Sequence, residues 1–411
     1  MIILKIKKIN LIELVISLYL LIFIFTYFIL PNFVSVYDPL DVDYIESGEF
    51  ENCFLITSVS HNVKIVSEQG EIKWETNKNG IFAHDSDLLP NGNVLIADTT
   101  QDRVIEIDIN DPSNIVWSWD ALNENDINWT KFGQEKLGKD LSYLKDRYTP
   151  FVWTHLNDVD FINGTKFGRD YDSLLISLNR FNMVLEVNYT DTKEILWWYG
   201  DPENPNILRH QHNPDRYNSG NTVICDSGND RIIEINTSTK EIVWELRLNF
   251  PNGKFRNVRD CDEIDGDRRL ITDSENNRLL VYDMISQSFI KEIRSPWFLN
   301  PYEADLLDDG RVISGNAMGG PMVILDYETG VTVGIIGLPL NHIFPISLFF
   351  GFWTYNSFYL VVNLRKSNRK GLKKLLEYKI YKRLVYIGIS LIFLLYINYV
   401  VMFLYRFQFR G

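Results

Sequence analysis

Short apolar runs separated by polar turns recur along the middle of the chain. The first run of each repeat reads VLIAD, LLISL, TVICD, RLITD or RVISG, and the second reads RVIEID, MVLEVN, RIIEIN, RLLVYD or MVILD. A third run that contains Trp follows in several repeats, as IVWSW, ILWWY and IVWEL. Short runs of this kind, with Asn, Asp and Gly turns between them, predict β-strands arranged as the blades of a propeller.

The repeats align on one grid, and each aligned copy starts at a polar or aromatic position. The copy from His84 aligns without a gap with the copy from His212, and those from Arg259 and Tyr302 fall on nearly the same positions. The copy from His155 fits after one insertion. Such internal self-similarity indicates one repeat architecture rather than several unrelated domains.

A sixth and less regular copy covers residues 50–74. Six blades close into a ring with only short, protected edges, so we predict an all-β, six-bladed β-propeller over residues 35–340. The charged, Trp-containing stretch 121–150 is too long for a turn within a blade. We expect it to form a cap insertion over one face of the propeller.

Apolar segments of bilayer length flank the repeats. Leu11–Leu30, Ile343–Val362 and Val385–Leu404 predict one N-terminal and two C-terminal transmembrane helices. The basic flank Lys5–Lys8 and the basic run Arg365–Arg383 border these segments. The positive-inside rule places both basic stretches in the cytoplasm, so the propeller is expected on the extracytoplasmic side.

The predicted organisation has three parts. Residues 1–34 form a cytoplasmic flank and anchor, the propeller follows, and residues 341–411 form two helices joined by a basic loop. We therefore expect a multi-pass protein of the cell membrane, in contact with the lipid bilayer. The net charge of −13 argues against nucleic acid as a partner. Three separate cysteines, with no CxxC pair, indicate neither a zinc site nor a disulfide framework.

The grid places five side chains in one ring. His84, His155, His212, Arg259 and Tyr302 start their repeats at the same position. Because equivalent positions in a cyclic array are related by rotation about its axis, these side chains are expected to point at one axial channel. An aspartate follows each of them three residues later, as Asp87, Asp158, Asp215, Asp262 and Asp305. We interpret these aspartates as structural, capping turns or accepting from backbone amides of a neighbouring strand.

Imidazoles that converge on one place are open to several uses. They can bind a metal, act as general acid and base, or act as a nucleophile. Arg259 in the same ring would repel a cation, so we expect no metal among the ring residues. The mixture of His, Arg and Asn favours a bound oxyanion such as a sulfate or phosphate ester.

Four segments resemble the arylsulfate sulfotransferase family. WTHLNDVDF resembles the family's W-x-H-x-N segment and contains His155 and Asn157. LLISLNR resembles the family strand that ends in an arginine, here Arg180. HQHNPDRYNSGNTVICDSGNDR resembles the segment with the family's nucleophile, which aligns with His212. FAHDSDLLPNGN aligns His84 with the family's first active-site histidine.

The resemblance implies a six-bladed propeller that transfers a sulfuryl group from an aryl sulfate to a phenol through a sulfohistidine. His212 would be the nucleophile and His84 the acid, with His155, Asn157 and Arg180 on the sulfuryl oxygens. The resemblance implies no cofactor, and the chain has no P-loop-like segment for PAPS.

Arg259 and Tyr302 complete the expected substrate-binding residues. Two alternatives remain open at this stage. One is a non-catalytic, membrane-anchored binding propeller, and the other is a metal-dependent propeller hydrolase.

Overall fold

A computed structural model describes residues 36, 38–58, 63–76, 81–149, 153–248, 253–317 and 320–337. The three predicted transmembrane segments and both basic stretches lie outside these described residues, so the predicted topology stays a prediction. Among the described residues, no helix is both long enough and apolar enough to span a bilayer.

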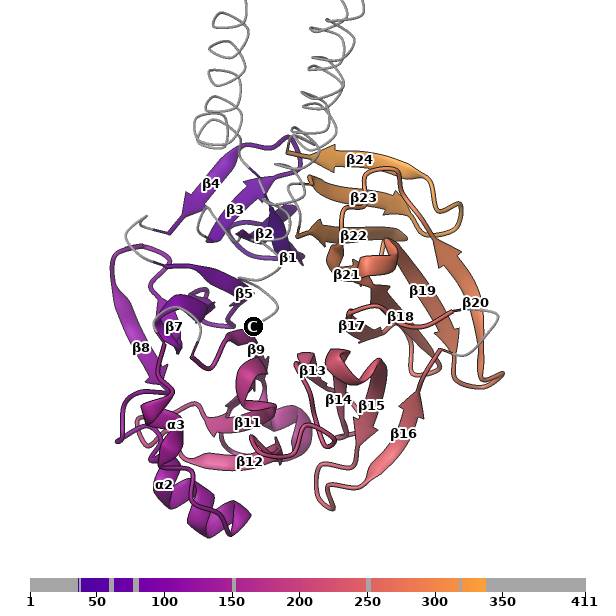
Figure 1. The fold of residues 1–411 in the computed structure, drawn as a ribbon. Coiled ribbons are helices and arrows are strands. Elements are labelled where there is room, and N and C mark those ends of the chain that lie inside the picture. Colours follow the sequence, from indigo (N-terminus) through magenta and orange to yellow (C-terminus); the bar gives the residue numbers. More distant parts are fainter. Residues whose placement is uncertain are drawn as a thin grey trace, which may run out of the picture. The chain divides into compact units, whose positions relative to one another are not determined.

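The described chain forms six four-stranded antiparallel sheets arranged around one axis (Figure 1). This confirms the predicted all-β, six-bladed propeller. The innermost strands of blades 1 to 6 are β1 (Pro39–Ile45), β5 (Ala83–Leu88), β9 (Leu156–Ile162), β13 (His212–Arg216), β17 (Val258–Glu263) and β21 (Pro301–Leu306). The second strands are β2 (Cys53–Ser58), β6 (Val94–Asp98), β10 (Ser173–Leu178), β14 (Thr222–Asp226), β18 (Arg268–Asp273) and β22 (Arg311–Asn316).

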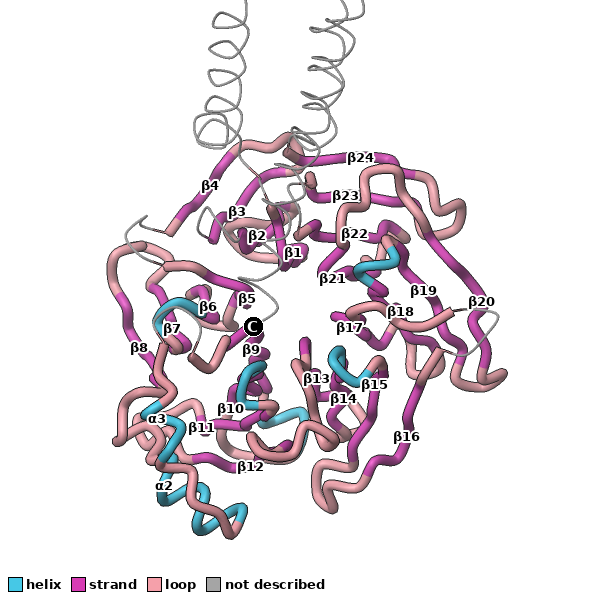
Figure 2. The backbone as a smooth tube through the Cα atoms, viewed as in Figure 1, coloured by secondary structure: helices cyan, strands magenta, loops and turns pink. Residues whose placement is uncertain are grey.

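The two outer strands of each blade complete the sheets. The third strands are β3 (Val63–Ser67), β7 (Arg103–Ile107), β11 (Met183–Asn188), β15 (Arg231–Ile235), β19 (Arg278–Asp283) and β23 (Met322–Asp326). The outermost strands are β4 (Ile72–Glu75), β8 (Ile115–Asp120), β12 (Ile195–Gly200), β16 (Ile242–Leu246), β20 (Ser288–Ile293) and β24 (Thr332–Ile336). Figure 2 shows that, in the described part of the chain, helical segments occur only in connections between these strands.

Burial explains why the second and third strands are continuous apolar runs. All six residues of β10 are buried, whereas β20 alternates between exposed and half-buried positions until its buried last residue. A strand covered on both faces by neighbouring blades has no solvent side and needs no polar alternation. The core therefore consists of apolar clusters between adjacent blades, such as Ile65 of blade 1 with Ile96 and Ile105 of blade 2.

Blade 1 begins upstream of the sixth repeat found in the sequence. Residues 50–74 contain β2 and β3 and most of β4, but the innermost strand β1 precedes them. Its sequence PLDVDYI follows the pattern of AHDSDL in β5. The sixth copy predicted from the sequence starts at residue 50 and therefore leaves this strand out.

The predicted cap insertion forms short helices that pack on blades 2 and 3. These are α2 (Trp129–Phe132), the π-helical turn η4 (Gly133–Leu137) and α3 (Tyr143–Asp146). Figure 1 shows α2 toward the rim, near β12. Trp129 and Trp153 each contact Phe181, with ring centroids 5.0 and 5.1 Å apart. The insertion thus ends in an aromatic cluster directly before β9.

Within the described ranges each blade is built from consecutive strands, so no strand is exchanged between blades to fasten the ring. Closure depends on packing of β1 against β21 and β22. At this seam Gly315 approaches blade 1 closely, since a Cβ atom added there would lie 2.2 Å from the carbonyl oxygen of Leu40. Only a residue without a side chain permits this approach.

We expect Gly315→Ala to destabilise the propeller by about 1–3 kcal/mol, because the added methyl group forces the seam apart. Urea denaturation monitored by tryptophan fluorescence measures the change. Gly334→Ala in β24 is the matched control, since its Cβ would lie 3.4 Å from the flexible end of Ile324. Equal stability of both variants would contradict a tight seam.

Candidate active site

Hydrogen bonds between blades show which inner-strand residues are equivalent. The amides of Ser86, Val159 and Ala304 each donate to a carboxylate of the preceding blade, over 3.0, 2.7 and 2.9 Å. These three residues therefore occupy equivalent positions in their blades. The residues two places before them are His84, Asn157 and Tyr302.

A second repeated bond gives the same register. Hydroxyls in the turns after the second strands donate to the first inner-strand carbonyl of the next blade: Thr99 to Leu156, Ser227 to Val258 and Ser274 to Pro301, over 2.6, 2.5 and 2.5 Å. The residues that follow these carbonyls are Asn157, Arg259 and Tyr302.

The predicted equivalence of His155 is therefore wrong by two residues. In blade 3 the position of His84 and His212 belongs to Asn157. The aspartate three places further along is accordingly Asp160, not Asp158. Blade 1 supplies Leu40, with Asp43 three residues later. We call the six equivalent side chains the histidine layer: Leu40, His84, Asn157, His212, Arg259 and Tyr302.

Side chains of the histidine layer contact one another across the axis of the propeller. Nδ1 of His84 lies 3.2 Å from the hydroxyl of Tyr302, although blade 1 separates their blades. The ring centroids of His212 and Tyr302 are 5.8 Å apart. The guanidinium of Arg259 stacks over Tyr302 at 4.0 Å from the ring centroid. The structure thus confirms that these four side chains converge, as the repeat predicted.

His155 reaches the same place from a different backbone position. Its ring centroid lies 4.9 Å from that of His84, and the residue is 3% exposed. Its φ of 48° matches those of the residues two places before the histidine layer in other blades, such as His210 and Asn300. This left-handed conformation is uncommon for a residue with a side chain and tends to occur at functional sites.

Arg180 lies in the short helical turn η6 (Asn179–Phe181), which is bonded to the start of β9. Its amide donates to the carbonyl of Thr154 at 2.9 Å. Thr154 is also fixed by Asp102 of blade 2, which accepts from its amide and its hydroxyl at 2.8 and 2.7 Å. Nε of Arg180 is buried and has no hydrogen-bond partner among the described residues. A buried donor of this kind is suited to an anionic ligand.

Asn157 is fully buried, and its amide nitrogen donates to the carbonyl of Gln211 at 3.0 Å. Asn179 donates to the same carbonyl, also at 3.0 Å. Asn157 therefore joins blade 3 to the residue before His212. It contributes to positioning that histidine in addition to any contact with a ligand.

The hydroxyl of Ser227 determines the proton position on His212. It donates to the carbonyl of Val258 at 2.5 Å, and Nδ1 of His212 lies 2.9 Å from it. Since a serine hydroxyl has one proton, it accepts from His212, and Nδ1 carries the hydrogen. Nε2 of His212 then holds the free lone pair. The sequence analysis did not identify Ser227 as a site residue, although it lies within the quoted CDSGN turn.

All three histidines are electrically neutral at ordinary pH. Burial, then the charges of Arg180 and Arg259, lower the pKa of His155 to about 3. Burial and then Arg259 lower the pKa of His212 well below its usual value. Burial and the neighbouring His155 lower that of His84. Two guanidinium groups beside neutral imidazoles create a positive site that favours an anion.

Comparisons with known proteins give one family. Residues 48–207 match the model of the arylsulfotransferase (ASST) family, a range that includes His84, His155, Asn157 and Arg180 and ends before His212. A search of the curated proteins gives no match.

Among solved structures, the fold is similar to virginiamycin B lyase from Staphylococcus aureus, with 11% identity over 74% of this chain and 84% of that one and a TM-score of 0.47. A protein of unknown function from Bacteroides caccae is similar at 13% identity, over 70% of this chain and 94% of that one, with a TM-score of 0.47. The family match covers strands β2 to β12 and four of the seven predicted site residues, and over this range the chain is similar to the arylsulfotransferase family.

Proposed function

We propose that this protein transfers a sulfuryl group from a phenolic sulfate ester to a phenol through a sulfohistidine on His212. The observation that carries the proposal is the pairing of His212 with Ser227 beside Arg259. It gives a buried, neutral imidazole whose Nε2 lone pair is available next to a fixed positive charge. The family match supports the general reaction. The geometry of His212 and Ser227 supports the choice of nucleophile.

In the first half-reaction, Nε2 of His212 attacks sulfur, so that an N–S bond forms as the S–O bond to the aryl group breaks. Arg180 and Arg259 stabilise the sulfuryl oxygens, on which negative charge is concentrated. Ser227 accepts the Nδ1 hydrogen throughout and keeps the ring in its reactive orientation. In the second half-reaction a phenol oxygen attacks sulfur, the N–S bond breaks, and His212 is restored.

His84 is suited to donate a proton to the leaving phenolate and to accept one from the acceptor phenol. Its imidazole is neutral in the free protein, but the negative charge of a bound sulfate ester favours protonation. Protonated His84 gives its proton to the leaving phenolate and recovers one from the acceptor phenol. Tyr302, hydrogen-bonded to Nδ1 of His84, holds the ring in place.

Acceptor dependence tests the proposed function. Purified full-length protein and 4-nitrophenyl sulfate should release 4-nitrophenol in sustained amounts only when a second phenol is added. Sulfation of that phenol should match the nitrophenol released. Release without any acceptor would indicate a hydrolase, and no release with a panel of phenols would indicate a binding propeller. Either result would contradict sulfuryl transfer.

Ser227→Ala should slow sulfation of His212 roughly tenfold, the effect of losing one orienting hydrogen bond. Ser227→Thr should retain the rate, because Thr99 makes the equivalent bond in blade 2. Stopped-flow release of nitrophenol in the first turnover measures this rate. Ser274→Ala is the matched control, since it loses the same bond between blades without contact to a histidine. Equal rates in both alanine variants would mean that Ser227 is only structural.

A further inference from the structure

A second group of polar side chains lies one residue beyond the histidine layer. At this position five of the six blades carry a carboxylate, and blade 4 carries Asn213. We call these carboxylates the acidic layer: Asp41, Asp85, Asp158, Asp260 and Glu303. The proposed sulfuryl transfer uses none of them.

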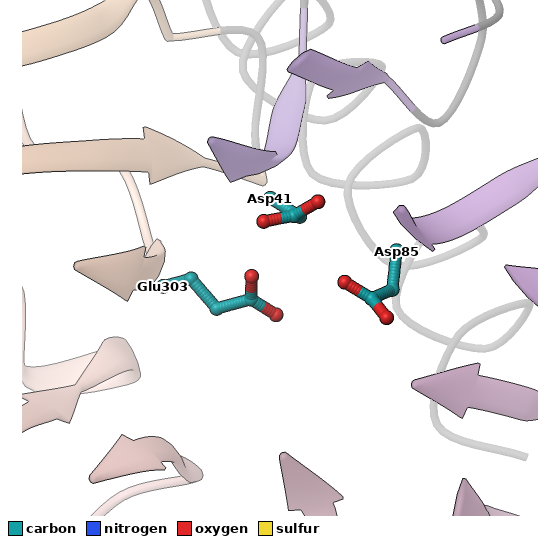
Figure 3. Close-up of side chains that lie close together, drawn as sticks. All are labelled: Asp41, Asp85 and Glu303. Atoms are coloured by element: carbon teal, nitrogen blue, oxygen red, sulfur yellow. The ribbon is translucent and has the colours of Figure 1, made fainter. Parts of the chain in front are cut away.

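Three members of the acidic layer are close enough to share one ligand. Asp41, Asp85 and Glu303 each offer a carboxylate oxygen, and these oxygens lie within 4.8 Å of one another. Figure 3 shows the three carboxylates turned toward one another from three different strands. Asp41 and Asp85 are held in place because Oδ2 of each accepts from an amide of the next blade, over 3.0 and 2.7 Å. Their orientation is therefore set by the backbone.

Unpartnered oxygens in the same layer point to a missing ligand. Oε1 of Glu303 has no hydrogen-bond partner among the described residues, and the residue is 9% exposed. In Figure 3 its carboxylate is directed toward Asp41 and Asp85. Oδ2 of Asp158 is likewise buried and without a partner in the described part of the chain, with the residue 5% exposed. Buried acceptors of this kind are normally satisfied by a donor or a cation.

The negative charges of the acidic layer need compensation. Several carboxylates held together away from water repel one another unless protons or a cation neutralise them.

We propose that Asp41, Asp85 and Glu303 bind one Ca²⁺ ion that fastens the seam of the ring. Carboxylate oxygens are the ligands that Ca²⁺ prefers, at 2.3–2.6 Å, so oxygens on one ion lie at most about 5 Å apart. The observed spacing fits this limit.

The blades that carry these three carboxylates explain what the ion would do. Asp41 belongs to blade 1, Asp85 to blade 2 and Glu303 to blade 6, so one ion joins the first blade to the last. Among the described residues no sheet includes strands of both blade 1 and blade 6, so the closure otherwise depends on packing of side chains. A cation bound here stabilises the closed ring, since it binds the folded arrangement and not the unfolded chain.

Calorimetric titration and thermal unfolding test the proposal. The full-length protein is freed of metal with EDTA and then titrated with CaCl₂ without substrate. We expect one bound ion per chain and a rise in Tm of roughly 5 °C at saturating calcium. No heat of binding together with an unchanged Tm would overturn the site.

Two variants locate the ion. Glu303→Gln should lose both the binding heat and the Tm rise, yet fold at least as stably as the calcium-free protein, because it removes a buried like charge. The control is Asp215→Asn, in the separate cluster of Asp215, Asp260 and Asp262. It should keep both effects. Loss of calcium binding in Asp215→Asn with retention in Glu303→Gln would place the ion elsewhere and refute the seam site.

Discussion

Replacing His212 by alanine should abolish sulfuryl transfer, with a fall on the order of 10⁴-fold or more. The reason is that Ser227 accepts the Nδ1 hydrogen of His212, which leaves the Nε2 lone pair of this imidazole free to attack sulfur. Mass spectrometry of the protein mixed with 4-nitrophenyl sulfate alone should show one added sulfuryl group on the peptide that contains His212. The His212→Ala protein should show none.

The His84→Ala variant distinguishes the role of the nucleophile from the role of the acid. It should still form the adduct from 4-nitrophenyl sulfate, because an acidic phenol leaves without a proton. With a donor whose leaving phenol is less acidic, the same variant should be slow. If His212→Ala transfers sulfuryl groups at an undiminished rate, the sulfohistidine proposal fails and a binding propeller becomes the better explanation.

Replacing Arg259 by glutamine should lower the rate of transfer roughly a hundredfold, the cost of removing one charged group from a developing anion. It should also change the pH dependence. Arg259 holds the pKa of His212 down, after burial itself. Without this cation His212 becomes protonated at a higher pH. Because only the neutral imidazole attacks, the acid limb of the rate profile should move to higher pH.

Arg259→Lys is the matched control for this charge effect. Lysine keeps the positive charge, so the acid limb should stay close to that of the parent protein. It loses the planar stacking on Tyr302 and the two-pronged contact with oxygens, so the rate should still fall. Profiles of first-turnover rate against pH distinguish the two effects. An unmoved acid limb in Arg259→Gln would show that Arg259 does not set the protonation of His212.

Charge alternates along the axis of this propeller. The histidine layer and Arg180 are positive or neutral, and the acidic layer begins one residue further along each inner strand. In the two proposals, adjacent residues of one strand therefore serve opposite ligands, an anionic ester and a divalent cation. This arrangement arises because every blade contributes the same two positions.

The repeat and much of the candidate site can be predicted from the amino-acid sequence. Alternation and turn residues are local properties, so the strands and the six-bladed closure were predictable. His84, His212, Arg259 and Tyr302 start regular repeats, and rotation about the axis makes them converge. Arg180 is different, since only the family resemblance identified it and nothing in its own repeat marks it as a site residue.

Tertiary structure alone decided the register of blade 3 and the start of blade 1. The insertion ends in an aromatic cluster just before His155, and the left-handed backbone of His155 corresponds to that of His210 and Asn300, two places before the histidine layer. Asn157 takes the histidine-layer position of blade 3 because the hydrogen bond from the Val159 amide to Asp85 fixes strand β9. Bonds between blades set these positions, and spacing along the chain does not encode them. The same holds for Ser227 and for the carboxylates at the seam, which acquire their roles only when distant blades meet.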